Sequence, residues 1–185
     1  MVNIVTLEDG TKYAVDVAFG GDGATRPLLL ESDHITRNIG TQDVRLIHDT
    51  IPEHTTDQKL WMYQCRNSPE LAWNSFYCFT EHEFLHSDFV VMSLFASKTI
   101  FQTTNVLAIK FLRNQEQVYG KIMLVNDVVK MNTSGKTKVE RVFDTEEERV
   151  DGLNKYFGIT LTQEEKEGIK GMHAELGGIG AGVSG

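Results

Sequence analysis

The segment that decides the fold spans residues 13–21 and reads Tyr13-Ala14-Val15-Asp16-Val17-Ala18-Phe19-Gly20-Gly21. Its side chains alternate between two faces, with bulky apolar residues on one and small residues beside a carboxylate on the other. Strict alternation of this kind predicts a β-strand, which we extend from Lys12 to Phe19. The glycines that follow predict a turn, because glycine adopts turn conformations without steric penalty.

Asp16 lies in the middle of this predicted strand, between two alanines on its own face. A carboxylate buried there needs a hydrogen-bond donor or a positive partner. One interpretation is therefore an orienting carboxylate, which holds a histidine beside a nucleophile. The alternative is an aspartate of an edge strand that faces water. Pattern alone favours the alternative, because most aspartates in proteins are exposed.

Working outward from this segment, several short strands are predicted at spacings typical of a barrel or a sandwich. They cover residues 1–7, 28–30, 35–39, 43–48 and 60–66. A helix is predicted over residues 87–97, with Ser87 as a possible cap. Its apolar stripe consists of Leu85, Phe89, Met92 and Ala96.

The remainder of the chain alternates strand and helix signals. Strands are predicted at residues 104–112, 121–129 and 138–143, with a hairpin turn at 132–136. Thr145 and Thr162 are each followed three residues later by glutamate, which predicts two capped helices. The first helix should end at Gly158 and bury Val150, Leu153 and Phe157.

Composition excludes several classes of function. The 185 residues carry a formal charge of −8, and 41% of them are hydrophobic, as in a soluble globular protein. An acidic chain is a poor ligand for nucleic acid or anionic membrane. No run approaches the roughly 20 apolar residues of a membrane span. Two cysteines without a metal-binding pattern or a signal peptide predict a cytoplasmic protein with no metal site.

The segment at residues 13–21 resembles the VDVGFGG stretch of the arylamine N-acetyltransferase family. The resemblance continues in the same order over almost the whole chain, to about residue 176. The matching segments are Arg26–Leu30 (RPLLL), Trp73–Phe79 (WNSFYCF), Asp88–Met92 (DFVVM), Gly120–Asp127 (GKIMLVND) and Tyr156–Leu161 (YFGITL).

This resemblance implies roles for individual residues. In the family the aspartate is the third member of a Cys-His-Asp triad, which implies that role for Asp16. The phenylalanine after it lines the acceptor pocket, which implies that role for Phe19. The family contacts coenzyme A through a helical tyrosine and a hydroxyl residue that follows a proline. Phe95 holds the tyrosine position but lacks the hydroxyl, and Ile100 replaces the proline. The nearest hydroxyl residues are Thr103 and Thr104, and Phe95 and Thr103 are taken as the implied contacts.

The family reaction is a ping-pong transfer of an acetyl group from acetyl-CoA to an arylamine or arylhydrazine, a step in xenobiotic metabolism. Its nucleophile lies in an R-G-G-x-C-x-E stretch that these residues do not contain, and its histidine lies just upstream of the segment that resembles residues 1–4. Cys65 and Cys78 are interpreted as ordinary core or surface thiols, and the histidines as solvated or capping residues. We therefore expect a truncated chain that is inactive alone.

Three hypotheses remain open at this point. The first is an enzyme fragment that needs the missing cysteine and histidine. The second is a non-catalytic relic that binds coenzyme A or a protein partner. The third is a β-rich interaction module unrelated to acyl transfer. The expected fold class is α+β, with a partial antiparallel β-barrel at residues 1–83, a lid domain of helix, β-meander and terminal helices at 84–176, and a disordered glycine-rich tail at 177–185.

Overall fold

The computed structural model describes residues 2–17, 19–98, 104–115, 117–133 and 135–177. Tertiary contacts divide the chain into two compact units. The first contains Met1–His82, Phe111–Lys121 and Thr133–Lys136, and the second contains Glu83–Lys110, Ile122–Asn132 and Thr137–Gly185. The chain first passes from one unit to the other between His82 and Glu83.

The first sheet of unit 1 is antiparallel and has the order β1 (Asn3–Thr6), β2 (Lys12–Val15) and β3 (Leu28–Leu29). The strand predicted as far as Phe19 ends at Val15, so the predicted position of Asp16 within a strand is wrong. The physical reason is pairing. Val15 pairs with Asn3, the first residue of β1, and the ladder between these two strands ends there among the described residues.

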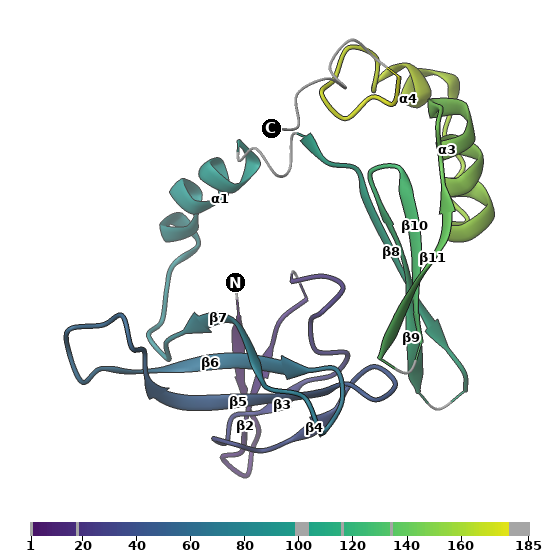
Figure 1. The fold of residues 1–185 in the computed structure, drawn as a ribbon. Coiled ribbons are helices and arrows are strands. Elements are labelled where there is room, and N and C mark those ends of the chain that lie inside the picture. The colour runs from purple at the N-terminus through teal and green to yellow at the C-terminus, as the bar shows by residue number, and fades with distance from the viewer. Residues whose placement is uncertain (1, 18, 99–103, 116, 134, 178–185) are drawn as a thin grey trace. The chain divides into compact units, whose positions relative to one another are not determined.

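The second sheet of unit 1 contains β4 (Thr36–Arg37), β5 (Asp43–Thr50), β6 (Lys59–Arg66) and β7 (Asn74–Phe79), in that order and antiparallel. Figure 1 shows β5, β6 and β7 as adjacent long strands. The antiparallel β region predicted for the first part of the chain is confirmed as two sheets. Pairings among the described residues do not close these sheets into a barrel.

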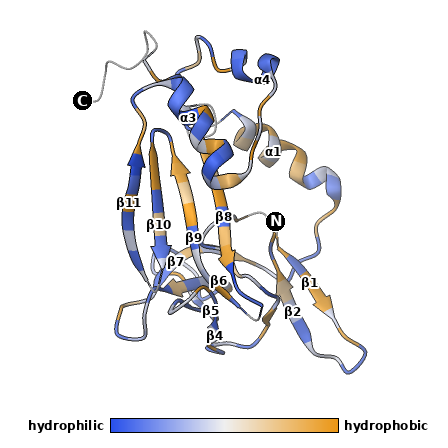
Figure 2. Cartoon of the chain, turned by 90° about the vertical axis from the view of Figure 1, so that its right-hand side faces the viewer, coloured by the Kyte–Doolittle hydropathy of each residue, from blue (hydrophilic) through white to orange (hydrophobic). Residues whose placement is uncertain are grey.

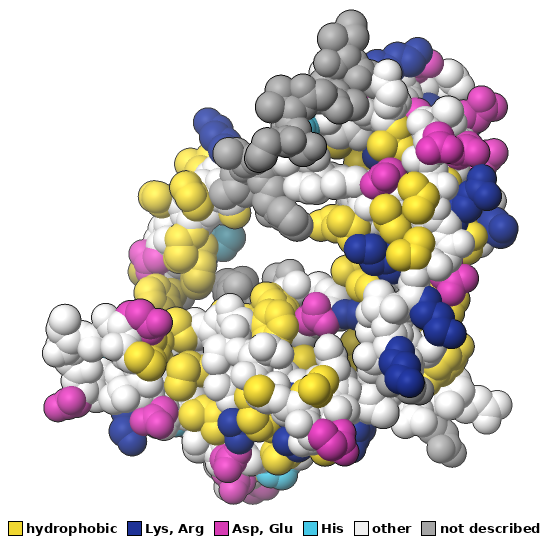
Figure 3. All heavy atoms as spheres, viewed as in Figure 1, with side chains coloured by type: hydrophobic (Ala, Val, Ile, Leu, Met, Phe, Trp, Pro, Cys, Tyr) yellow, Lys and Arg dark blue, Asp and Glu magenta, His cyan; other side chains and the backbone are white. Residues whose placement is uncertain are grey.

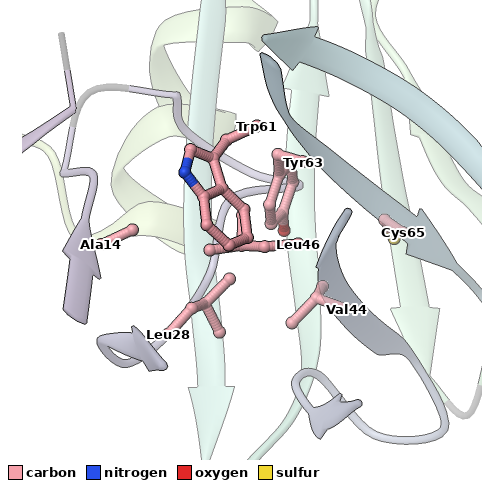
Figure 4. Packing of buried hydrophobic residues seen from close by; sticks show 7 residues of the cluster. All are labelled: Ala14, Leu28, Val44, Leu46, Trp61, Tyr63 and Cys65. Atoms are coloured by element: carbon pink, nitrogen blue, oxygen red, sulfur yellow. The ribbon is translucent and has the colours of Figure 1, made fainter. Parts of the chain in front are cut away.

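The core of unit 1 is built by alternation along β5 and β6 (Figure 4). Every second residue points inward, as a half-buried strand requires. The buried cluster consists of Ala14, Leu28, Val44, Leu46, Trp61, Tyr63 and Cys65. Each fully buried large apolar side chain stabilises the fold by about 1.5–3 kcal/mol, so these strands form a firm base for the loops at their ends.

In unit 2, helix α1 spans Phe89–Ser97 and follows a short 3-10 turn, η1 (His86–Asp88). The N-cap residue of α1 is Asp88, not Ser87, and its carboxylate accepts a hydrogen bond from the Leu85 amide at 2.8 Å, at the start of η1. The predicted apolar stripe is not buried: Leu85 and Met92 are 69% and 53% exposed. The hydropathy colouring of Figure 2 marks most of this helix as hydrophobic, and Figure 3 shows hydrophobic side chains on its surface. The helix has too few polar residues to form a distinct polar face.

The predicted meander is confirmed as a four-stranded sheet with the order β11-β10-β9-β8. Its strands are β8 (Leu107–Arg113), β9 (Val118–Val125), β10 (Val128–Thr133) and β11 (Lys136–Val142). The single strand predicted at 121–129 is in fact two strands joined by a turn at Asn126, which has a φ of 56°. Asparagine tolerates this left-handed conformation better than most residues, so Asn126 can turn the chain between two apolar strands.

Both capped helices are confirmed. Thr145 caps α3 (Glu146–Gly152), which continues as η2 (Leu153–Phe157) to the left-handed Gly158, and Thr162 caps α4 (Gln163–Glu167). The predicted inward residues Val150, Leu153 and Phe157 are only half-buried. Arg149, 1% exposed, is the buried side chain of α3, because Glu146 and the carbonyls of Asn126 and Ala174 accept its hydrogen bonds.

Candidate functional site

Asp16 lies immediately after β2, and its side chain is half-buried. The hydroxyl of Tyr77, on β7, donates a hydrogen bond to the Asp16 carboxylate. Burial and then this hydrogen bond raise the pKa of Tyr77 above its ordinary value. The contact joins the end of β2 in one sheet of unit 1 to β7, the edge strand of the other sheet. A carboxylate that accepts such a bond is held in a fixed direction, as an orienting residue must be.

Phe19 lies on the same side of unit 1 as Tyr77 and contacts a group of aromatic rings. Its ring centroid is 5.1 Å from that of Tyr77, 5.3 Å from that of Phe76 and 6.0 Å from that of Tyr63. Tyr63 and Tyr77 stack on each other at 5.1 Å with an interplanar angle of 15°. Tyr77 therefore contacts both residues that the resemblance singled out, Asp16 and Phe19.

The loop after Phe19 is held by side chains from distant parts of the chain. Lys121, which is 6% exposed, donates hydrogen bonds of 2.6 Å to the Gly21 carbonyl and of 2.6 Å to the Asp22 carboxylate. The Tyr63 hydroxyl donates to the Asp22 carbonyl at 2.7 Å. The buried Asn38 donates to the Gly23 carbonyl at 3.0 Å. These contacts satisfy backbone carbonyls that would be costly to bury unpaired, and they fix the loop.

Neither cysteine has the environment of a catalytic nucleophile. Cys65 is buried in β6, and burial, followed by the charge of Asp22, raises the pKa of its thiol to about 11. A thiol is nucleophilic as its thiolate, so Cys65 is unreactive near neutral pH. Cys78 is exposed on β7, one residue beyond Tyr77 and therefore on the opposite face of the strand. The prediction that both are ordinary core or surface thiols agrees with these positions.

All six histidines are exposed. His48 stacks on Trp61 across the β5–β6 pair, with ring centroids 4.7 Å apart. The two rings border a hollow of about 300 Å³ at one end of these strands. Asp16 and Phe19 are not among the residues that line it. Within the described part of the chain, no group of three or more His, Cys, Asp or Glu side chains is arranged to hold a metal ion.

The predicted coenzyme A contacts belong to unit 2 or lie outside the described residues. Phe95 is on α1 and is 74% exposed, so its ring is available for contact. Thr103 and Ile100 lie outside the described residues.

Within the described residues, no helix is long and apolar enough to cross a membrane.

Three residues of the site were missed by sequence reasoning: Phe76, Tyr77 as the partner of Asp16, and Lys121. Tyr77 had a usable signal, because it lies in the segment WNSFYCF that resembles a family motif. Phe76 and Lys121 also lie in matching segments, but the resemblance gave neither of them a role. The role of Phe76 depends on an irregular strand pairing, and that of Lys121 depends on contacts with a loop about 100 residues earlier in the chain.

Comparison with known proteins gives consistent matches. A family model described as N-acetyltransferase matches residues 1–166. The N-malonyltransferase FDB2 of Gibberella moniliformis is 34% identical over 171 residues, covering 85% of this chain and 49% of the relative. Its counterpart in Fusarium pseudograminearum (strain CS3096) is 35% identical over 182 residues, covering 91% and 53%. The chain thus spans about half the length of these curated relatives.

Solved structures agree in fold. The arylamine N-acetyltransferase from Salmonella typhimurium aligns with a TM-score of 0.66 at 24% identity, covering 91% of this chain and 59% of that one. The Mycobacterium marinum arylamine N-acetyltransferase in complex with CoA aligns with a TM-score of 0.67 at 24% identity, covering 85% and 53%. With the family match over most of its length, the chain belongs to the N-acetyltransferase family and has the fold of its arylamine N-acetyltransferase members.

Proposed function

We propose that the protein is an acyl-CoA-dependent N-acyltransferase that acylates an arylamine or arylhydrazine. The observation that carries the proposal is the Asp16 carboxylate, held by the Tyr77 hydroxyl beside the exposed ring of Phe19, in a chain of this family. Asp16 is the proposed orienting member of a Cys-His-Asp triad. Phe19 is the proposed contact for the aromatic ring of the acceptor.

In the proposed reaction a cysteine thiolate attacks the thioester carbonyl of acyl-CoA, and the carbon–sulfur bond to coenzyme A breaks. Coenzyme A leaves as its thiolate and takes the proton carried by the histidine, which is then neutral. The amine nitrogen then attacks the acyl-enzyme, loses a proton to the histidine, and the thiolate is regenerated. Asp16 would hold the histidine in the tautomer that this sequence needs and stabilise its charged form.

The cysteine of this mechanism is neither Cys65, whose thiol pKa is raised to about 11, nor Cys78 on the other face of β7. We therefore propose that these 185 residues do not turn over by themselves. Activity requires a polypeptide that also supplies the family cysteine and histidine. The two free cysteines fit a reducing compartment, and a cytoplasmic location is part of the proposal.

The acyl group is a separate question within the proposal. The resemblance implies acetyl-CoA, whereas the curated relatives are named N-malonyltransferases. Phe95 and Thr103 are the proposed positions of coenzyme A contact. Acetyl-CoA and malonyl-CoA should therefore be compared as donors, with the donor of higher kcat/KM identifying the acyl group.

A second candidate function is a non-catalytic module that binds coenzyme A or a protein partner. It is favoured by the environments of the two cysteines, neither of which suits a nucleophile. The two candidates differ in what Asp16 does. In the enzyme its carboxylate is essential for transfer, and in a binding module its replacement leaves coenzyme A binding unchanged.

The test uses the 185-residue chain and a chimera that places before Met1 the part of the Gibberella moniliformis relative that precedes its match to this chain, as the proposed source of the cysteine and histidine. Acyl-CoA is added, and free coenzyme A is measured with and without an arylamine. The chimera should release coenzyme A, and the chain alone should not. Asp16→Asn in the chimera should lower kcat/KM on the order of 10⁴-fold, as for the orienting aspartate of a serine triad. Asp49→Asn, an exposed carboxylate 3.9 Å from Lys59, is the matched control.

The outcomes separate the candidates. Coenzyme A release by the 185-residue chain after replacement of both cysteines would show that the triad assignment is wrong. A chimera that binds acyl-CoA but never releases coenzyme A would favour the binding module.

A further inference from the structure

β7 contains an irregularity next to the proposed acceptor site. Tyr77 pairs with Tyr63 and Ser75 pairs with Gln64, so the residue between them, Phe76, has no partner on β6. This is a β-bulge, in which one strand carries an extra residue. Bulges are common beside active sites because the extra residue redirects a side chain.

The bulge changes the direction of Phe76. In a regular strand, neighbouring residues point to opposite faces, so Phe76 and Tyr77 would lie on opposite sides of the sheet. Here both rings contact the ring of Phe19, at 5.3 Å and 5.1 Å between centroids. Phe76 also contacts Tyr63, at 6.1 Å. The extra residue has therefore brought Phe76 to the side of the sheet that carries Phe19.

The exposed surface of this ring group is apolar. Phe19 and Phe76 are 37% and 42% exposed and meet edge to face at 77°. The two tyrosines of the group lie deeper, and their hydroxyls already donate hydrogen bonds, that of Tyr63 to the Asp22 carbonyl and that of Tyr77 to Asp16. A ligand at this surface therefore meets ring edges and faces, which suit another planar aromatic ring.

The distance between the two exposed rings is fixed from both sides. Phe19 precedes the loop that Lys121 and Tyr63 hold at Gly21 and Asp22. Phe76 is fixed by the pairing of its neighbours in β7. These contacts hold the backbone near Phe19 and the backbone at Phe76. The size of the aromatic group that fits between or beside the two rings should therefore depend on the Phe76 side chain.

We propose that Phe76 is a specificity-determining residue that forms, with Phe19, a two-ring wall for the aromatic acceptor. The proposal rests on the proposed function, because it assigns to the same site the residue that limits acceptor size. Deleting the ring by Phe76→Ala should weaken the binding of a one-ring amine and admit a two-ring amine more readily. Enlarging it by Phe76→Trp should do the reverse for the two-ring amine.

The first test measures binding without chemistry. The 185-residue chain is titrated with 4-methoxyaniline, a one-ring amine, and with 2-aminofluorene, whose aromatic system is larger, by ligand-observed NMR. Phe76→Ala should raise the Kd for 4-methoxyaniline roughly twofold to tenfold, the loss expected for one aromatic contact. Phe84→Ala removes an exposed phenylalanine whose ring contact is with Phe89, and it should leave the Kd unchanged.

The second test measures discrimination in the chimera, as the ratio of kcat/KM for 2-aminofluorene to that for 4-methoxyaniline. This ratio should rise with Phe76→Ala and fall with Phe76→Trp, while Phe84→Ala, outside the proposed acceptor site, should leave it unchanged. If the Phe76→Ala variant does not fold, Phe76→Leu replaces it in both tests, because leucine removes the ring but retains apolar bulk. A parent chimera that releases no coenzyme A contradicts the proposed function, and the binding test then decides the inference. Unchanged binding and an unchanged ratio in folded variants overturn the role of Phe76 alone.

Discussion

At the scale of single residues, the meaning of a side chain in unit 1 is set by contacts with other strands. Asp16 leaves its own sheet at Val15 and is held by a tyrosine of the other sheet. Cys65 follows the inward alternation of β6, where burial suppresses its ionisation. Cys78 has the same chemistry in isolation, but it lies on the outer face of β7. Position, rather than residue type, therefore separates an inert thiol from a reactive one.

This difference predicts unequal reaction of the two thiols with a disulfide reagent such as dithionitrobenzoate. At about pH 8 one thiol per chain should react quickly and the other slowly, because the pKa of Cys65 is raised to about 11 and its thiol is buried. Cys78→Ser should remove the fast phase, and Cys65→Ser should leave it intact. Urea should make both thiols of the parent fast. Two equal fast phases in the folded parent would contradict the buried position of Cys65.

At the scale of elements, close packing in unit 2 depends on a glycine in α3. Gly152 is buried against the ring of Phe143, the residue after β11. A Cβ atom at position 152 would lie 2.1 Å from the Phe143 Cζ atom, a distance that real contacts do not reach. The helix signal at Thr145 predicted this helix correctly, but no sequence pattern indicated why a glycine occurs at its end.

Gly152→Ala should therefore destabilise unit 2, although alanine is the better helix former. The expected loss is about 1–3 kcal/mol, the usual effect of overpacking, measured by urea unfolding followed by circular dichroism. Phe143→Leu in the same chain should recover part of the loss by making room. Gly168→Ala is the control, because its added Cβ would lie 3.3 Å from the nearest atom, the Glu165 carbonyl oxygen. Equal effects at the two glycines would show that the ring of Phe143 is not the cause.

At the scale of the whole molecule, the two units differ in the groups that can report on them. Both tryptophans, Trp61 and Trp73, belong to unit 1. The three weak acids whose pKa values are raised by burial, Tyr63, Cys65 and Tyr77, belong to it as well. Tryptophan fluorescence therefore follows the unfolding of unit 1 alone. At alkaline pH, ionisation of these three acids should affect the stability of that unit.

Unit 1 should lose stability as the pH rises above about 9. Each of the three acids keeps its proton to a higher pH in the folded chain than in the unfolded chain, where ordinary values of 9.0 for the thiol and 10.0 for the phenols apply. The unfolded chain thus ionises first, and the stability present below the ordinary values falls as pH increases through them. The urea midpoint followed by tryptophan fluorescence should be lower at about pH 10.5 than at about pH 8.

Replacing one of these acids tests the cause. The Tyr77→Phe variant has no ionisable group at position 77. Its urea midpoint should therefore depend less on pH over this interval than the midpoint of the parent. This difference is expected even if the variant is less stable than the parent at pH 8. The interpretation fails if the parent midpoint is constant between the two pH values.

Much of the fold could be predicted from local signals. Turns at glycines, caps at Thr145 and Thr162, and alternation along β5 and β6 act over a few residues, and the structure confirms them. Strand ends were less predictable. The alternation at residues 13–19 continues beyond Val15, but the ladder stops there because the neighbouring strand begins opposite it. The single strand predicted over residues 121–129 was wrong because only two polar residues, Asn126 and Asp127, separate its apolar parts, and the left-handed Asn126 turns the chain there.

The sequence by itself determined the α+β class, the family, and Asp16 and Phe19 as the residues to examine, because motif order and local periodicity are properties of the chain alone. Only the tertiary structure decided that Tyr77 binds Asp16, that Lys121 holds the loop after Phe19, and that Phe76 faces the same side as Tyr77. These contacts depend on register, on a bulge and on residues far apart in sequence. A strand whose pairing shifts by one residue presents the opposite set of side chains, so no local pattern can specify them.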